Sequence, residues 1–147
     1  RESNKYPDAK HQDKEAQLEW LDKVLSEATE DWVIVAGHHP VYADTKKPRI
    51  ERDDMKSAIN SILRKHKVAM YICGHIHSFQ HIRRKGYDID YLVNSSASWA
   101  RDVKKTKDMQ YCSNEAGFSV ITASKKRLSV HMIDKNGNIL HTVNKTK

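Results

Sequence analysis

The first half of the chain alternates between two patterns of hydrophobic and polar positions. Apolar residues recur at helical spacing over residues 18–28 and again from residue 50 or residue 55 to residue 64, with charged residues between them, which predicts two amphipathic helices. Continuous apolar runs at residues 32–36 and 68–73 each end in a glycine and are typical of short strands buried on both faces. This order predicts a parallel sheet with a crossover helix, and we expect the first helix to pack one face against it.

The second half carries shorter, antiparallel strand patterns. Residues 79–84 and 87–94 flank a Lys-Gly pair, which predicts a hairpin. The polar stretch at residues 95–116 resembles a long surface loop, which is uncommon in a compact domain unless it has a function. Three further strands are predicted at residues 117–123, 128–133 and 139–143, the last two joined by an Asn-Gly turn.

Composition limits the classes of protein that this chain can represent. With 147 residues, 38% of them hydrophobic and 31% charged, the chain is at most one globular domain, which we place at residues 15–147 after a polar lead-in or linker at residues 1–14. A net charge of +7 suits anionic partners, but the basic residues are dispersed without interleaved aromatics, so we expect no nucleic-acid partner. No apolar run approaches the about 18 residues that cross a bilayer, so we expect no membrane span.

Histidines directly follow both predicted parallel strands. His38 and His39 come after the first strand and its glycine, and His75 and His77 come after the second. Because the carboxyl ends of neighbouring parallel strands lie at one edge of a sheet, and because imidazole ligates zinc, iron and manganese, the pattern predicts that His38, His75 and His77 ligate metal. His39 is a weaker candidate that could contact substrate or orient a ligand, with a structural role as the alternative.

The other histidines and the cysteine of the second strand are given structural interpretations. His81 is a weak site candidate for which a structural role is at least an equal reading, and Cys73 at the end of an apolar run is predicted to be a buried thiol. The remaining four histidines are assigned to surface or strand-face positions: His11, His66, His131 and His141.

Two motifs carry a family resemblance. Residues 35–42, Val-Ala-Gly-His-His-Pro-Val-Tyr, and residues 73–77, Cys-Gly-His-Ile-His, resemble the last two metal-binding blocks of the calcineurin-like metallophosphoesterases. More narrowly, they are similar to the small, tartrate-resistant type of purple acid phosphatase. The segments at residues 17–21, 94–97 and 117–118 also fit this family, so the resemblance extends over nearly the whole chain from about residue 17.

The resemblance implies an α/β (α+β) fold, namely a four-layer β-sandwich flanked by helices, and the hydrolysis of phosphomonoesters. It further implies a dinuclear centre of iron with iron, zinc or manganese, in which His38 and His75 ligate the divalent ion and His77 the ferric ion. Two cations would clamp the phosphate ester and lower the pKa of a bound water without a covalent enzyme intermediate. Family habit also implies a secreted, periplasmic or lysosome-like location.

The chain departs from the family in what it lacks. The blocks GDxG, GDxxY and GNH, which supply the family's carboxylate, tyrosine and asparagine ligands, do not occur in this sequence. We therefore predict that the chain is the carboxyl-terminal half of the phosphatase domain, that the amino-terminal half is its partner, and that alone it is inactive. Three neutral imidazoles do not offset the charge of a mixed-valence pair, so we predict no purple diiron centre in this polypeptide alone.

A second departure is the loop at residues 43–47, where the family commonly has a histidine near the leaving group. Ala-Asp-Thr-Lys-Lys stands there instead. Lys46 or Lys47 could neutralise phosphate, with an exposed charge as the alternative. The stretch at residues 95–116 is expected to overhang the site with Trp99 and basic residues: Lys104, Lys105 and Lys107.

Two alternatives stay open on the residues alone. In one, the chain is a catalytically inactive phosphatase fold that serves as a scaffold or binding module. In the other, the three histidines hold a single zinc ion with an open water position, or this chain alone holds no metal.

Overall fold

The computed structural model describes residues 11–94, 96, 97 and 99–147. Most of the predicted lead-in and Ser95 of the segment at residues 94–97 lie outside the described residues. The helices are α1 (Lys14–Glu27) and α2 (Arg49–Lys65), and the strands are β1 (Ile34–Gly37), β2 (Met70–Cys73), β3 (Phe79–Arg83), β4 (Asp90–Asn94), β5 (Met109–Ser113), β6 (Gly117–Ala123), β7 (Arg127–Asp134) and β8 (Ile139–Thr146).

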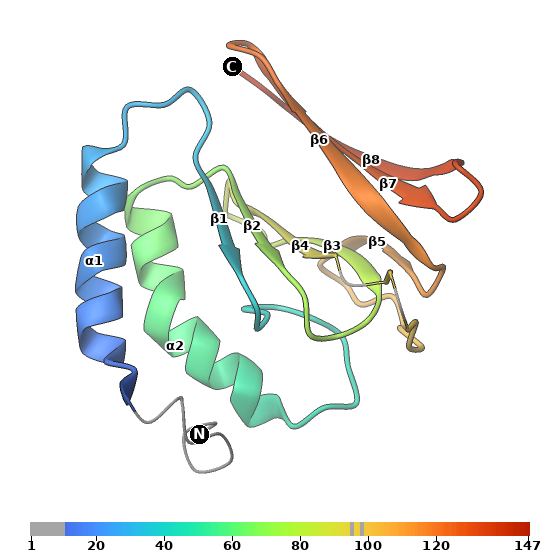
Figure 1. Ribbon diagram of the computed structural model, residues 1–147, viewed down its shortest axis with the longest axis horizontal. Helices are drawn as coiled ribbons and strands as arrows, with labels where there is room; N and C mark the ends of the chain where they lie inside the picture. Colours follow the sequence, from blue (N-terminus) through green and yellow to red (C-terminus); the bar gives the residue numbers. More distant parts are fainter. Residues whose placement is uncertain (1–10, 95, 98) are drawn as a thin grey trace.

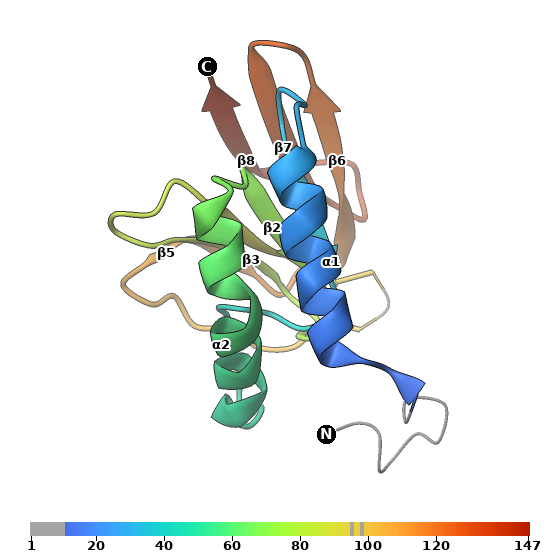
Figure 2. The same ribbon diagram turned by 90° about the vertical axis from the view of Figure 1, so that its left-hand side faces the viewer.

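The described residues form three layers (Figure 1). A mixed sheet has the order β1-β2-β4-β3-β5, in which β1, β2 and β4 are parallel and β3 and β5 are antiparallel to their neighbours. Helices α1 and α2 lie together on one side of it (Figure 2), and the antiparallel sheet β6-β7-β8 covers the other side. The predicted α/β class is confirmed, with its strand-helix-strand unit followed by antiparallel strands.

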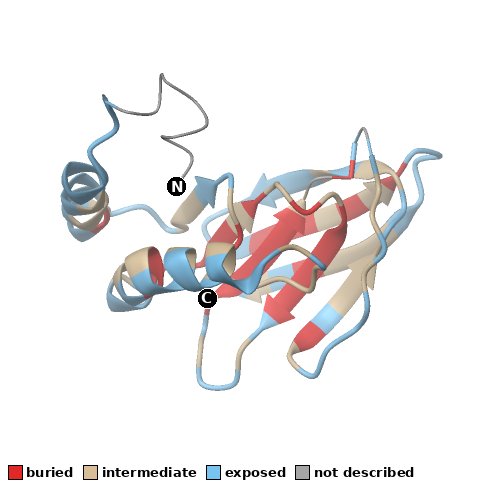
Figure 3. Ribbon diagram, turned by 90° about the horizontal axis from the view of Figure 1, so that it is seen from below, coloured by how far each residue is buried: buried red, intermediate tan, exposed pale blue. Residues whose placement is uncertain are grey.

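Side-chain alternation along the central strands divides the core into two parts. Tyr71 and Cys73 of β2 belong to the cluster under the helices, whereas Met70 belongs to the cluster between the two sheets. Buried residues accordingly gather on the central strands, and the outer faces of the helices are exposed (Figure 3). The prediction of a buried thiol is confirmed, since Cys73 is 5% exposed and burial raises its pKa to about 12.

Strand β1 corrects the expectation that both parallel strands are buried on both faces. Whereas three of the four residues of β2 are buried, β1 has two half-buried residues followed by the exposed Ala36 and Gly37. The reason is position, because β1 is the edge strand of the described sheet. An unpaired apolar edge of this kind is what proteins normally cover.

Leu25 of α1 and Leu63 of α2 are buried in the cluster under the helices, as the predicted amphipathic pattern requires, whereas Val24 of α1 is 41% exposed. The carboxylate of Asp13 accepts a hydrogen bond from the backbone N–H of Ala16 at 2.9 Å and caps α1. Asp22 of α1 pairs with Lys65 and His66 at the end of α2, at 2.8 and 2.7 Å.

Within the described part of the chain, neither helix has the length and apolar character that a membrane crossing requires.

The predicted hairpin at residues 79–94 is confirmed as the antiparallel pair β3 and β4. The long polar loop expected at residues 95–116 is wrong in part, because β5 lies within it and pairs with β3. Polar residues flank this short strand in the sequence, so no clear apolar pattern indicates it, and Met109 is its one buried residue. The Asn-Gly turn between β7 and β8 forms as expected, with φ +88° at Gly137.

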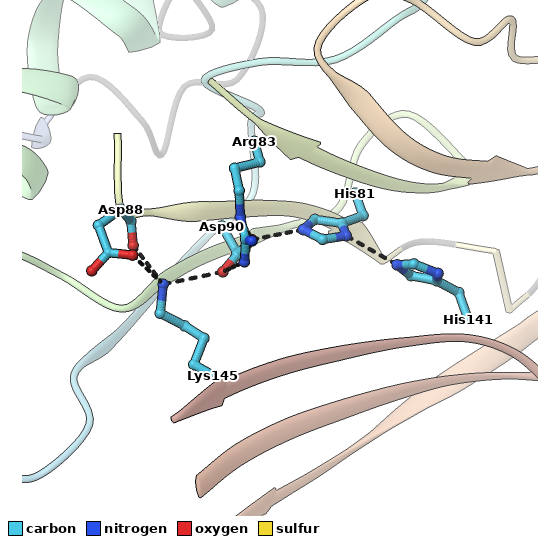
Figure 4. Close-up of polar contacts among 6 residues, drawn as sticks. All are labelled: His81, Arg83, Asp88, Asp90, His141 and Lys145. Carbon is cyan, nitrogen blue, oxygen red and sulfur yellow. Dashed lines mark hydrogen bonds and ion pairs between the residues drawn. The ribbon is translucent and has the colours of Figure 1, made fainter. Parts of the chain in front are cut away.

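A buried charged network joins the mixed sheet to the sheet β6-β7-β8 (Figure 4). Asp90 of β4 is fully buried. It accepts hydrogen bonds from His81 at 2.7 Å and Arg83 at 2.8 Å, both on β3, and from Lys145 of β8 at 3.2 Å. The other nitrogen of His81 lies 2.9 Å from His141 of β8. His81 and His141 therefore have structural partners between the sheets.

Candidate metal centre

The candidate site is built on two loops at the carboxyl ends of β1 and β2. The backbone N–H of Gly74 donates to the carbonyl of His38 at 3.1 Å, which ties the two loops together. The hydroxyl of the buried Tyr71 donates to the carbonyl of His39 at 2.8 Å. Tyr71 reaches that carbonyl by passing over Gly37, where an added Cβ would lie 2.3 Å from the tyrosine oxygen. The glycine that ends β1 thus makes this close approach possible.

The loop after β2 holds its two histidines in an uncommon backbone conformation. His75 has φ +68° and His77 has φ +60°, so both lie in the left-handed region that non-glycine residues seldom adopt. Each such residue costs on the order of 1–3 kcal/mol, and such costs concentrate at functional sites. The histidines themselves, and not the preceding glycine, make this tight turn.

Three imidazoles converge at the edge of the sheet. Nε2 of His38 and Nδ1 of His75 lie 3.0 Å apart, and one ring nitrogen from each of His38, His39 and His75 lies within 4.8 Å of the others. Two nitrogens bound to one tetrahedral zinc ion at 2.0–2.1 Å are about 3.3 Å apart. The first pair lies at hydrogen-bond distance, about 0.3 Å closer than two ligands of one ion, so a small separation of the rings would admit an ion between them.

His77 is oriented by a different group. Its Nδ1 lies 3.1 Å from the carbonyl of Trp99, so the ring donates there and, when neutral, carries its lone pair on Nε2. A histidine held in this way by a carbonyl is the usual arrangement of a metal-ligating imidazole. Of the predicted ligands, the structure brings His38 and His75 together, adds His39 to them, and places His77 against Trp99.

Two charged residues lie at the far nitrogen of His75. Its Nε2 is 3.0 Å from a carboxylate oxygen of Glu51 and 2.8 Å from the amine of Lys47. Lys47 is half-buried, whereas Lys46 is exposed. Glu51 was not predicted as a site residue, although placing the start of α2 at Arg49 would have put this acid in the first helical turn, next to the loop after β1.

The surroundings of His75 favour its neutral form. Burial lowers its pKa, and the positive charges of Lys47 and His38 act in the same direction, against Glu51. For Glu51, burial is the largest single influence and raises the pKa, but the hydrogen bond to His75 and the nearby positive charges, Lys47 among them, together outweigh it, so its pKa is lowered. A neutral imidazole with a carboxylate behind it is the protonation state that a metal ligand needs.

The cluster fits a divalent ion. Three imidazole nitrogens with an open fourth position are a known zinc arrangement. If Nδ1 of His75 faces the ion, Nε2 carries the proton and donates it to Glu51, which completes a carboxylate–histidine–metal chain. In that state the ammonium of Lys47, 2.8 Å from the same nitrogen, cannot donate to it and has to turn away from Nε2. The cluster of His38, His39 and His75 contains only neutral ligands, so a second ion of higher charge needs carboxylates in addition to it.

Replacing Glu51 is expected to weaken metal binding because Glu51 orients the ring of His75 and does not itself contact the ion. Glu51→Ala should lower the affinity of the chain for Zn²⁺ by about 10- to 100-fold, the usual effect of removing a partner behind a ligating histidine, and Glu51→Gln should lower it less. Calorimetric titration with Zn²⁺ measures this. Asp53→Asn is the matched control, because Asp53 lies on the same helix and pairs with the exposed Arg49. Wild-type affinity in Glu51→Ala would contradict the assignment.

Comparisons with known proteins agree on one family. The family described as calcineurin-like phosphoesterase matches residues 2–79, a segment that contains both histidine motifs. Purple acid phosphatase 4 of Arabidopsis thaliana is 30% identical over 125 residues, which are 82% of this chain and 36% of that protein. Human tartrate-resistant acid phosphatase type 5 is 29% identical over 133 residues, covering 84% of this chain and 40% of that protein.

Solved structures share the fold. The structure described as GAP50, the anchor in the inner membrane complex of Plasmodium, superposes with a TM-score of 0.78 at 21% identity, over 88% of this chain and 41% of that one. Purple acid phosphatase PPD1 from yellow lupin seeds superposes with a TM-score of 0.73 at 16% identity, over 88% of this chain and 28% of that one. The chain spans about 36–40% of the length of the curated relatives above.

Proposed function

The chain belongs to the calcineurin-like phosphoesterase family, and on that premise we propose that it supplies the histidine ligands of a two-metal centre that hydrolyses phosphomonoesters. The observation that carries the proposal is the 3.0 Å approach of Nε2 of His38 to Nδ1 of His75, at the ends of adjacent parallel strands. In this arrangement His38 and His75 hold the divalent ion, and His77, carried over from the family's motif, holds the second.

The chemistry that the metals supply is a hydroxide from bound water at moderate pH and electrostatic stabilisation of the leaving oxygen. The chain's own residues position that chemistry. Glu51 holds His75 through its Nε2, and the carbonyl of Trp99 holds His77. The ring centroid of His39 is 4.2 Å from that of His75. His39 therefore either contacts the substrate or orients the metal-ligating ring of His75.

Lys47 takes the place of the histidine that the small purple acid phosphatases commonly carry in this loop. Lys47 is half-buried, and its amine lies at the site, 2.8 Å from Nε2 of His75. The loop is held by Gln80, which is fully buried and bonds both the N–H and the carbonyl of Asp44 at 2.8 Å. A fixed ammonium group there neutralises charge on the phosphate.

The remaining ligands come from an amino-terminal half of the same domain. Three observations support this part of the proposal: the missing ligand motifs, the exposed edge strand β1, and the share of its relatives' length that the chain spans. A strand paired with β1 would cover that edge and bring carboxylates to the end of the sheet. Alone, the chain then binds at most one ion and is inactive.

A scaffold without catalysis is the second candidate. The absence of a histidine at residues 43–47 favours it, and the described anchor protein has the same fold. The converging imidazoles favour catalysis, because a scaffold needs neither the ligands nor the left-handed backbone that presents them.

The test compares the chain alone with the chain joined to the amino-terminal half of its full-length protein. Metal analysis and hydrolysis of 4-nitrophenyl phosphate are measured on both. We expect about two bound ions and hydrolysis only when both halves are present. Bound metal without hydrolysis of any phosphomonoester would favour the scaffold, and hydrolysis by the chain alone with one zinc ion would favour a mononuclear site.

A further inference from the structure

A cavity of about 430 Å³ lies beside the loop that carries His75 and His77. Ile76, the residue between these histidines, lines it, as does Lys47, whose amine touches His75. Its other walls come from the loop after β1 and from the segment that contains Trp99 and Arg101. The cavity therefore adjoins the candidate metal centre, and none of the proposed ligands lines it.

The far wall of the cavity is fixed to the metal-binding loop. The backbone N–H of Arg101 donates to the carbonyl of His77 at 2.7 Å. The rings of Trp99 and His77 have centroids 5.7 Å apart, and the guanidinium carbon of Arg101 lies 4.6 Å from the centroid of the Trp99 ring. Trp99 is nevertheless 61% exposed. Part of its indole ring is therefore open to solvent beside the cavity and close to His77.

The side chains that line the cavity carry more positive than negative charges. Lys46, Lys47 and Arg101 line it together with one carboxylate, Asp102. Nε of Arg101 is buried and has no hydrogen-bond partner among the described residues. A buried donor of this kind is costly unless an acceptor is supplied, and a carboxylate or phosphate oxygen is the acceptor that a guanidinium group binds best.

We propose that this cavity binds the leaving group of the phosphoester, and that Trp99 and Arg101 select a planar aromatic leaving group that carries its own negative charge. The inference rests on the proposed function for the position of the phosphoryl group at His38 and His75. Trp99 stacks on the ring, Arg101 and Lys46 attract the additional anionic substituent, and Lys47 lies between the cavity and the phosphoryl position.

The test measures binding of three phosphonates that the enzyme cannot hydrolyse, using the zinc-loaded full-length protein and calorimetry. Methylphosphonate reports the phosphoryl position, phenylphosphonate adds the ring, and 4-phosphonobenzoate adds a carboxylate to the ring. We expect each addition to tighten binding, and the two together to do so by about tenfold or more. Trp99→Ala should remove the advantage of phenylphosphonate over methylphosphonate. Arg101→Gln should remove the advantage of 4-phosphonobenzoate over phenylphosphonate.

Lys104→Gln is the matched control, because Lys104 is an exposed cation of the same segment that does not line the cavity. It should leave all three affinities unchanged. Equal affinity for the three phosphonates in the wild type, no binding of any of them, or unchanged ratios in both cavity variants would overturn the proposal. Retained ratios in a protein that hydrolyses no phosphomonoester would instead overturn the proposed function and leave the anionic aromatic subsite in place.

Discussion

Alanine at both His38 and His75 should abolish Zn²⁺ binding by the chain and lower phosphomonoester hydrolysis by the full-length protein by about a thousandfold or more. The two facing nitrogens, 3.0 Å apart, are the pair that one ion can share, and neither Glu51 nor His39 can replace both. A bound divalent ion supplies several kcal/mol of transition-state stabilisation, and about 1.4 kcal/mol corresponds to a factor of ten in rate. Metal analysis and kcat/KM for 4-nitrophenyl phosphate measure the two effects.

The control for this double variant removes two other histidines. His11→Gln with His131→Gln keeps the number of changed imidazoles constant, because His11 is exposed and His131 lies on β7, where it contacts Thr142 of β8. Metal content and kcat/KM should equal those of the wild type. If the His38 and His75 variant kept its metal and its activity, the site assignment and the proposed function would both fail.

The strand-end histidines could be predicted because their signal is local. A short apolar run, a glycine and a histidine are contiguous in the sequence, and parallel topology then brings two such ends to one edge. The sequence pattern does not predict which imidazoles face one another. The left-handed conformations of His75 and His77 set the directions of their rings, and a sequence pattern does not contain such torsion angles.

Strand burial depends on the position of a strand in the sheet as well as on its sequence. The runs that became β1 and β2 are both continuous and apolar, yet β2 is central and β1 is an edge strand of the described sheet. Strand β5 shows the opposite case, since its polar residues gave no strand pattern and its pairing with β3 depends on partners 27 to 34 residues away in the sequence, from Ile82↔Met109 to Phe79↔Ser113. Burial is a property of the assembled sheet.

Glu51 and Asp90 illustrate two reasons why acidic residues were missed. Glu51 acts in the site only because α2 begins at Arg49, and helix starts are the least certain part of a periodicity argument. Asp90 lies opposite Arg83 in the hairpin register, so two of its three side-chain partners, Arg83 and His81, follow from the hairpin. Lys145 and His141 come from the second sheet, whose placement no local pattern indicates.

Asp90→Ala should destabilise the protein by about 3–5 kcal/mol, the cost of removing one member of a buried ion cluster. Asp90 is fully buried, and without it Arg83 and Lys145 keep their positive charges with no buried counter-charge, and His81 loses the acceptor of its ring nitrogen (Figure 4). The free energy of unfolding from urea denaturation measures the loss. The matched control is Asp88→Asn, which removes a fully exposed carboxylate 3.2 Å from the same lysine and should leave that free energy unchanged within error.

Acid should weaken the same interface in two stages. Burial lowers the pKa of His141 to about 4, below its ordinary 6.5, so the unfolded chain binds more protons between these values and stability falls as the pH drops from about 6.5 to 4. Asp90 follows, because despite its burial the hydrogen bonds from His81 and Arg83 hold its pKa below the usual 3.8, and its contribution is lost as the pH falls below that value. His141→Gln should flatten the first stage alone. A first stage that keeps its slope in His141→Gln would show that another group controls it.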